Sequence, residues 1–444
     1  MWYGVIMQSK YSAPFINHYV LSLLSGFILL SSANQVFAEN LTLHQAEQIA
    51  LTEEPGLISQ NWQFRSLMEM AIADGQLMDP KLQIGVANLP TDSFDFSQEA
   101  MTQLKVSYLQ QFPPGDTREL KQQSTQIKSE LMHSKMAGRN LTILQDVRLT
   151  FLEIFYWEQA RETILKNKQL FIQLVDIVQS LFSVGRNDQQ DLIRAQLELS
   201  RLDDRLTKID QQIRTYRARL SRWVGIENSL KSLAVELPEI ATMQLQDNFK
   251  NLSELLQLHP KVQQIDKDIE INRNDIQLVK ESLKPGWGLN VSYAFRDEDA
   301  NGNDRADFIS AAVTFDLPLF STNRQDKKLL SKEHQYQSLK SSRLELIRQL
   351  VAELQQEIAN EATLLKRQQL YTSLLLPQAK QQAQASLLAY QSDRGSFSDL
   401  MRAYMDDLNA NLDAKRIAID MRKTQAKLLY FVPAFRQEIH TDFQ

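Results

Sequence analysis

Two runs of alternating apolar and small or polar residues lie within residues 285–318. Successive side chains of a β-strand point to opposite faces, so this alternation predicts two strands that each have one apolar face. The apolar positions are Trp287, Leu289, Val291, Tyr293 and Phe295 in the first run, and Ile309, Ala311, Val313, Phe315 and Leu317 in the second. About ten residues is the length that a tilted strand needs to cross a bilayer, although one isolated hairpin would also fit the edge of a soluble sandwich.

This hairpin is one of two, because two earlier runs alternate in the same way. The four predicted strands cover about residues 81–88, 102–112, 287–296 and 307–317. Prolines around the strands recur at one offset: Pro55, Pro80 and Pro113 are followed 205 residues later by Pro260, Pro285 and Pro318 (260 − 55, 285 − 80, 318 − 113). Self-similarity at a fixed offset is typical of a tandem duplication.

Long helices are predicted between and after the strands. Glycine and proline are sparse, at 13 and 12 in 444 residues, and a seam of apolar residues spaced alternately three and four apart runs from Leu192 to Trp223. This heptad spacing drives left-handed coiled-coil packing. Pro377 should kink its helix, because proline removes a backbone donor and clashes with the preceding turn. The predicted helices cover about residues 116–184, 188–224, 321–392 and 397–431.

The duplication divides the chain into two repeats. The first repeat covers residues 39–228, a connector 229–245, the second repeat 246–432 and a C-terminal tail 433–444. The short turn that joins each pair of long helices is called a tip; the first lies within residues 182–199 and the second within residues 390–408. Matching tip residues are 208 positions apart (Asp399 follows Asp191, 399 − 191), whereas the matching prolines are 205 apart. Three extra residues therefore lie between Pro318 and the second tip. The predicted fold class is mainly α, with long coiled-coil helices and four strands of a membrane β-barrel. A periplasmic coiled-coil scaffold would account for the helices but not for the strands.

The first 38 residues have the composition of a secretory signal peptide. They contain no Asp or Glu and one Lys, and their apolar core runs from Val20 to Leu30. That core is too short to span a bilayer as a helix but has the length of a signal-peptide core. The sequence Val36-Phe37-Ala38 fits a cleavage site, so we expect an exported protein, with a simple membrane anchor as the alternative.

Composition narrows the function classes. The net charge of −5 gives no electrostatic reason to expect nucleic-acid binding. The absence of cysteine excludes disulfides and thiolate metal sites. The six histidines show no metal-ligand spacing, and no phosphate loop or nucleophile elbow occurs, so neither an enzyme nor a cofactor or metal site is expected. His44 and His259, near the starts of the two repeats, are expected to be solvated.

Several motifs resemble those of the TolC family of outer-membrane efflux proteins. They are LTLHQAEQIALTEEPGL at residues 41–57, LFSVGRNDQQDLIRAQLEL and AYQSDRGSFSDLMRAYMDDL at the two tips, LLLPQAKQQA before the second tip and LPLFSTNRQ after the fourth strand. VANLPTDSF at residues 86–94 and QQFPPGDTREL at residues 110–120 resemble the heavy-metal-efflux branch. The residues Gly115-Asp116-Thr117-Arg118 stand where that branch often has a Gly-Lys-Arg turn.

The resemblance implies a homotrimer in the cell outer membrane. Each chain would contribute four strands to a shared twelve-stranded barrel, and the helices would form a periplasmic tunnel that works with an adaptor protein and an inner-membrane pump. A barrel shared among several chains is physically reasonable, because closed membrane barrels need about eight strands or more and one chain supplies four. The implied function is a passive duct for heavy-metal cations; a multidrug-efflux or type I protein-secretion channel is the alternative.

The resemblance also implies site residues near the tips. Channels of this family constrict at a ring of acidic side chains just beyond the second tip, where Asp399 matches the first family aspartate. The second aspartate position holds Arg402, and Asp406 lies nearby. The alternative for Asp399 is a structural pair with an arginine. The expected adaptor-docking residues are Gly185 and Arg186 at the first tip and Arg394 and Gly395 at the second; both glycines can supply the positive φ of a tight turn.

Overall fold

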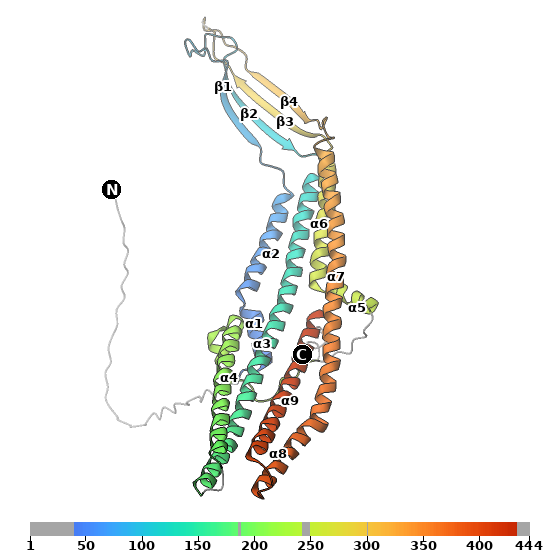
Figure 1. Cartoon of the computed structure of the whole chain (residues 1–444). Coiled ribbons are helices and arrows are strands. Elements are labelled where there is room, and N and C mark those ends of the chain that lie inside the picture. The colour runs from blue at the N-terminus through green and yellow to red at the C-terminus, as the bar shows by residue number, and fades with distance from the viewer. Residues whose placement is uncertain (1–39, 185–187, 242–248, 300, 433–444) are drawn as a thin grey trace, which may run out of the picture. The chain divides into compact units, whose positions relative to one another are not determined.

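The computed structural model describes residues 40–184, 188–241, 249–299 and 301–432. These residues form long helices that lie side by side and a four-stranded sheet at one end of them (Figure 1). The predicted combination of long paired helices with four strands is therefore confirmed. The expected signal peptide and C-terminal tail lie outside the described residues. In the described part of the chain, no helix has both the length and the apolar character needed to cross a membrane.

Helices and strands follow one another in nearly the same order in both halves of the chain. The first half contains α1 (Leu43–Glu53), α2 (Pro55–Asp74), β1 (Lys81–Ala87), β2 (Gln103–Phe112), α3 (Thr117–Ser183) and α4 (Gln189–Ser229). The second half contains α5 (Phe249–Leu255), the 3₁₀ turn η1 (Leu256–Leu258), α6 (Pro260–Glu281), β3 (Gly286–Phe295), β4 (Phe308–Asp316), α7 (Gln325–Leu370), the π-helical turn η2 (Tyr371–Leu375), α8 (Leu376–Gln391) and α9 (Phe397–Phe431).

The four strands form one antiparallel sheet in the order β1-β2-β3-β4. The registers place Val106 beside Ile84 on one side and Tyr293 on the other, and Tyr293 beside Ile309. These apolar side chains share one face and are all exposed. On the opposite face, Ser107 pairs with Ser292 and both are buried. The alternation in the sequence therefore produces a sheet with an exposed apolar face.

The three extra residues of the second half lie between β4 and α7. The second-half helix that runs through α7, η2 and α8 begins 208 residues after α3 (325 against 117) and ends 208 residues after it (391 against 183). The two long helices therefore have equal lengths. The insertion belongs to the segment between Pro318 and Gln325, which is seven residues long against four from Pro113 to Thr117.

The kink predicted at Pro377 takes the form of a π-helical turn. Residues Tyr371–Leu375 form η2, and Pro377 lies in the first turn of α8 directly after it. A π-turn inserts an extra residue into the helical ladder and so accommodates a proline that cannot donate a backbone hydrogen bond.

Helix α3 lies at the centre of the helical part and contacts α2, α4, α6 and α9. Apolar side chains pack along it in separate clusters, one around Phe151 and Leu220 and a second, nearer the tips, around Phe171 and Leu400. A third cluster joins α6, α7 and α9 around Leu350. The heptad seam is the source of several of these contacts: Ala195, Leu202, Ile209, Leu220 and Trp223 are all buried.

Candidate functional site

The second tip connects α8 to α9 through residues 392–396. Asp393 adopts a positive φ of 54°, and Gly395 does not have a positive φ. The expectation that Gly395 supplies this conformation is therefore wrong; Asp393 supplies it two residues earlier, because Asp tolerates the left-handed region. Gly395 is needed for a different reason, because a Cβ there would lie 3.1 Å from the Cβ of Ala389. Gly185 and Arg186 of the first tip lie outside the described residues.

Asp399 takes part in the cap of α9. The hydroxyl of Ser396 accepts a hydrogen bond from the Asp399 amide (3.1 Å) and donates one to the Asp399 carboxylate (2.8 Å). Arg402 lies one turn further on, with its Nη1 3.7 Å from Asp399 Oδ1. The Asp399 side chain is nevertheless 63% exposed. The structure thus brings Asp399 and Arg402 together, and the carboxylate remains open to solvent.

Asp406 lies on the same face of α9 two turns beyond Asp399 and is exposed. Its neighbour Asp407 is half-buried and accepts a hydrogen bond from Asn411 Nδ2 (3.2 Å). Burial raises the pKa of Asp407 above its ordinary value, and the contributions of Asn411 and Lys380 lower it by less. Of these two neighbouring residues, Asp406 is therefore the one whose side chain is exposed.

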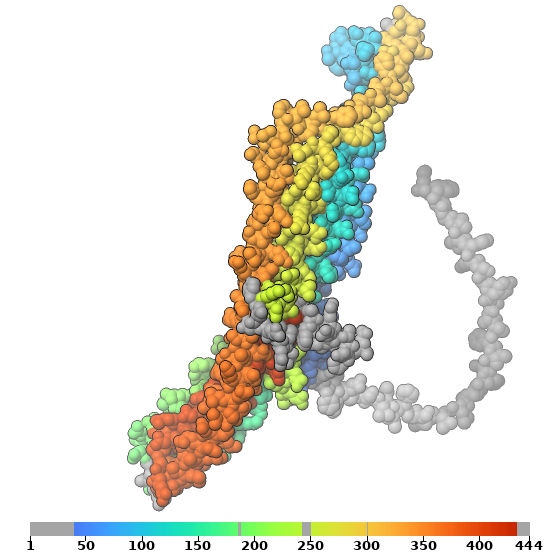
Figure 2. Space-filling model, turned by 90° about the vertical axis from the view of Figure 1, so that its right-hand side faces the viewer, coloured from blue at the N-terminus to red at the C-terminus, as the bar shows by residue number. Residues whose placement is uncertain are grey.

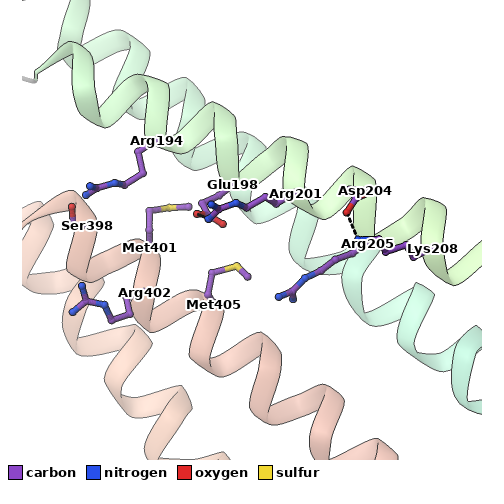
Figure 3. A pocket seen from close by; sticks show the side chains of 10 residues that line it. All are labelled: Arg194, Glu198, Arg201, Asp204, Arg205, Lys208, Ser398, Met401, Arg402 and Met405. Carbon is purple, nitrogen blue, oxygen red and sulfur yellow. Dashed lines mark hydrogen bonds and ion pairs between the residues drawn. The ribbon is translucent and has the colours of Figure 1, made fainter.

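A groove of about 750 Å³ separates α4 from α9 near the tips. Half of its ten lining side chains are basic, and Figure 3 shows Met401 and Met405 of α9 between the two helices. The lining residues are Arg194, Glu198, Arg201, Asp204, Arg205 and Lys208 of α4 and Ser398, Met401, Arg402 and Met405 of α9. Sequence reasoning missed this groove, although basic residues three to four apart on α4 were a signal for a charged helix face.

Ion pairs within α4 neutralise part of this groove. Glu198 pairs with Arg201 (2.6 Å) and Asp204 pairs with Lys208 (2.7 Å). Arg205 instead donates to the side-chain oxygen of Asn409 on α9 (3.1 Å). Five basic and two acidic side chains line the groove, so it carries a net positive charge. Its electrostatic character is opposite to that of an acidic constriction.

A buried carboxylate connects α3 to α9 further from the tips. Glu153 accepts two hydrogen bonds from Arg416 (2.9 and 3.0 Å) and one from Lys423. Burial acts to raise the pKa of Glu153, but the two cations outweigh it and hold the pKa below its ordinary value. Glu153 is therefore a charged structural link. Within the described residues, no group of three or more His, Asp or Glu side chains could hold a metal ion.

His259 is fully buried, which contradicts the expectation of a solvated residue. Its Nδ1 accepts a hydrogen bond from the Lys261 amide (3.2 Å), so it caps α6, and its ring lies 5.1 Å from that of Tyr430. Burial, and then the Lys261 charge, lower the pKa of His259 to about 4. The end of α9 covers the histidine, a contact between segments that are distant in the sequence. His44 is exposed, as expected.

Solved structures with a similar fold include outer-membrane proteins. VceC from Vibrio cholerae is 14% identical with a TM-score of 0.73, and the alignment covers 88% of this chain and 95% of that one. CusC is 12% identical with a TM-score of 0.75, covering 95% and 99%. The open MtrE channel of Neisseria gonorrhoeae is 13% identical with a TM-score of 0.72, covering 88% of each chain. No family model and no curated protein sequence matches.

These similarities define the fold class of this chain: it has the fold of outer-membrane channels that are built from long helices and a small sheet. Within that class the fold is of the TolC type, as the tip and strand motifs of the sequence indicated.

Proposed function

We propose that this chain is the outer-membrane channel of a tripartite efflux system. The observation that carries the proposal is the sheet: four strands with an exposed apolar face at the end of helices too long and polar for surface loops. An apolar outer face and a small or polar opposite face are what a membrane barrel requires. The helices then occupy the periplasm, and the protein is a passive duct that catalyses no reaction.

The open edges of the sheet support assembly as a homotrimer. Strand β1 pairs with β2 and β4 with β3, and within the described residues neither β1 nor β4 has a partner on its other side. Unpaired edges cannot persist in lipid, because each unsatisfied backbone group there costs several kcal/mol. Two copies would give eight strands and an interior filled by side chains, whereas three give twelve strands and room for a pore.

The tips are the surfaces proposed to meet the periplasmic adaptor and, through it, the inner-membrane pump. Arg394 and Gly395 occupy the second tip; in the first, Arg186 is the match of Arg394 at the offset of 208 (394 − 186), and Gly185 directly precedes it. The exposed side chain of Arg394 and the tight turn that Gly395 permits support this assignment.

We propose heavy-metal cations as the cargo on the basis of the two loops that resemble the heavy-metal-efflux branch. The α4–α9 groove favours a second cargo class, small organic anions, because its net charge is positive. The ratio of cation to anion permeability in planar bilayers separates these two candidates. A passive duct needs no tight binding site in either case, because tight binding would slow release.

The constriction is proposed to lie at Asp399, with Arg402 reducing the repulsion among three copies. Asp406, two turns further along, is the second candidate ring. Asp399→Asn should abolish block by divalent or trivalent cations with little change in trimer stability, because the side chain is exposed. Persistent block in Asp399→Asn together with its loss in Asp406→Asn would move the constriction along α9. Loss of folding in Asp399→Asn would favour a structural role in the cap.

Reconstitution of the purified full-length chain tests the proposal as a whole. The detergent-solubilised protein should have the mass of three chains and should raise the conductance of a planar bilayer in discrete steps. A protein that stays soluble without detergent and never conducts would be a coiled-coil scaffold instead, and the channel proposal would then be wrong.

A further inference from the structure

A second basic groove lies at the opposite end of the helices, between α6 and the first turns of α7. Its volume is about 440 Å³. The lining side chains are Val279 of α6 and Asn323, Arg324, Lys327, Lys328, Ser331 and Lys332 at and after the start of α7. The two helices run side by side below the sheet in Figure 2, where α7 is orange and α6 yellow. This α6–α7 groove therefore lies beside the junction between sheet and helices.

Most of the positive charge in the α6–α7 groove is not neutralised by the chain itself. Lys332 pairs with Asp275 (2.7 Å), and Asp326 accepts a hydrogen bond from Ser321 (3.3 Å). Arg324, Lys327 and Lys328 are exposed, and none forms an ion pair with an acidic residue of the described ranges. The amino terminus of a helix favours anionic side chains, so three cations there oppose the helix dipole. The folding of this chain gives no reason for their placement.

The residues directly before this basic cluster are apolar and strongly exposed. Leu319 is 74% exposed and Phe320 is 88% exposed, and Leu317 before them is exposed as well. They lie in the segment that holds the three extra residues of the second half. The first half has Gly115-Asp116-Thr117-Arg118 at the corresponding junction and no such apolar pair. The exposed apolar pair Leu319 and Phe320, followed by a cluster of cations, is thus a feature of the second half alone.

We infer that the α6–α7 groove binds the headgroup of an anionic phospholipid whose acyl chains lie against Leu319 and Phe320. This inference rests on the proposed function, because a membrane barrel places the helical end of its sheet at the periplasmic face of the bilayer. At that face the acyl chains of the bilayer give way to phosphate headgroups, and the exposed apolar side chains followed by cations have the same order. The occupant is a bilayer lipid, because a free phosphate would make no use of the two exposed apolar side chains.

Lipid titration of the purified, detergent-solubilised protein tests the inference. The probes are phosphatidylglycerol and phosphatidylcholine with identical acyl chains, and bound lipid is counted by native mass spectrometry. Phosphatidylglycerol should bind more tightly. Each basic side chain near a membrane surface contributes about fivefold to the affinity for anionic lipid. The triple variant Arg324→Gln, Lys327→Gln, Lys328→Gln should therefore lose at least tenfold in affinity for phosphatidylglycerol and keep its affinity for phosphatidylcholine.

A matched variant removes the same charge from the other groove. Arg194→Gln, Arg201→Gln, Arg205→Gln lies near the tips and should bind phosphatidylglycerol as the unaltered protein does; an equal loss there would overturn the inference in favour of a general charge effect. Phe320→Ser should weaken binding of both lipids. If Phe320→Ser instead dissociates the oligomer without changing lipid binding, a second copy covers this surface and the inference is wrong.

Inorganic phosphate at millimolar concentration should not displace the lipid; complete displacement would make the groove a site for free anions. The two proposals fail separately. Headgroup preference in a protein that does not conduct would contradict only the channel proposal, whereas conductance without headgroup preference would contradict only the lipid site.

Discussion

The two long helices of this chain, α3 in the first half and the α7–η2–α8 helix in the second, have equal lengths but different surroundings. Twenty residues of α3 are buried, because α2, α4, α6 and α9 surround it. In the α7–η2–α8 helix, which contacts mainly α6 and α9, seven are buried (six in α7, none in η2 and Ala383 in α8). The second helix also contains a π-turn, which α3 lacks. The number of buried residues in these two helices thus depends on the neighbours that each helix has rather than on its length.

The exposed side of α7 is not polar throughout. Leu330, Leu344, Leu365 and Leu370 are exposed there in a single chain. In the proposed trimer, such positions are available to a neighbouring copy, whereas the core positions of α3 are filled within one chain. Substitutions in the two helices should therefore affect different properties.

The largest difference should appear between Phe151→Ala in α3 and Leu344→Ala in α7. Phe151 is fully buried, and truncation of a buried phenylalanine costs about 3–5 kcal/mol in the free energy of unfolding. Leu344 is exposed, so its truncation should change that free energy by about 0.5 kcal/mol or less. Denaturant unfolding in detergent, at a dilution where the trimers have dissociated into single chains, measures both. Equal losses would contradict the comparison, because Leu344 would then be as buried as Phe151 within one chain.

In the sheet, by contrast, the two halves should behave alike. Val106→Arg in β2 and Val291→Arg in β3 place a charge on the exposed apolar face, which costs about 2–4 kcal/mol near the middle of a bilayer. Ser310→Arg on the opposite face, at the exposed partner position of Ser292, should cost much less and should change the conductance. Assembly of each variant in lipid provides the measurement. Failure of Ser310→Arg together with normal assembly of Val291→Arg would mean that the two faces are exchanged, as a register shift of one residue would do.

Glu153→Gln should destabilise the protein more than Glu357→Gln in α7 does. Glu153 is held by Arg416 and Lys423, whereas Glu357 has one cation, Lys427. Breaking a buried pair costs about 3–5 kcal/mol; we expect about 2–3 kcal/mol for Glu153, because Arg416 is 32% exposed. The depressed pKa of Glu153 means that this contribution is present above about pH 4.5 and is lost as the pH falls further. Equal costs for the two variants would contradict the comparison.

The last predicted effect concerns His259 at the start of the second-half helix α6 and is absent at neutral pH. Its pKa of about 4, against 6.5 for an unburied histidine, means that the unfolded chain binds a proton that the folded chain does not. The free energy of unfolding should therefore fall by about 1.4 kcal/mol per pH unit as the pH drops from 6.5 towards 4. His259→Phe should remove this component, and unfolding curves between pH 7.5 and 4.5 measure it. Identical pH dependence in both proteins would contradict it.

The strands and long helices could be predicted from the sequence because their signals are local. Apolar residues at every second position predicted the strands, and apolar residues spaced three and four apart predicted the helices. Side-chain environments that depend on distant segments could not be predicted. His259 is buried by Tyr430, and the α4–α9 groove exists only because two helices far apart in the sequence face one another. At the second tip, Asp393 and Gly395 both allow a positive φ, so the sequence could not decide between them.

Among the site residues, the contact of Asp399 with Arg402 was predictable from their spacing of one helical turn. The bond of Asp399 to Ser396 follows from helix capping, since a serine three residues before an acidic residue is a recognised start signal for a helix. What the sequence could not reveal is which faces of α4 and α9 enclose the groove beside them.

The central claim, that the sheet crosses the outer membrane with its loops outside the cell, is tested most directly by labelling on intact cells. The chain contains no cysteine, so Ser93→Cys and Asn301→Cys each introduce one thiol into the two strand-connecting loops. Both should react with an impermeant maleimide, whereas Ser180→Cys near the first tip should react only after the outer membrane is permeabilised. No labelling at positions 93 and 301 in protein that is present in the outer membrane, together with labelling at position 180 of intact cells, would contradict the account.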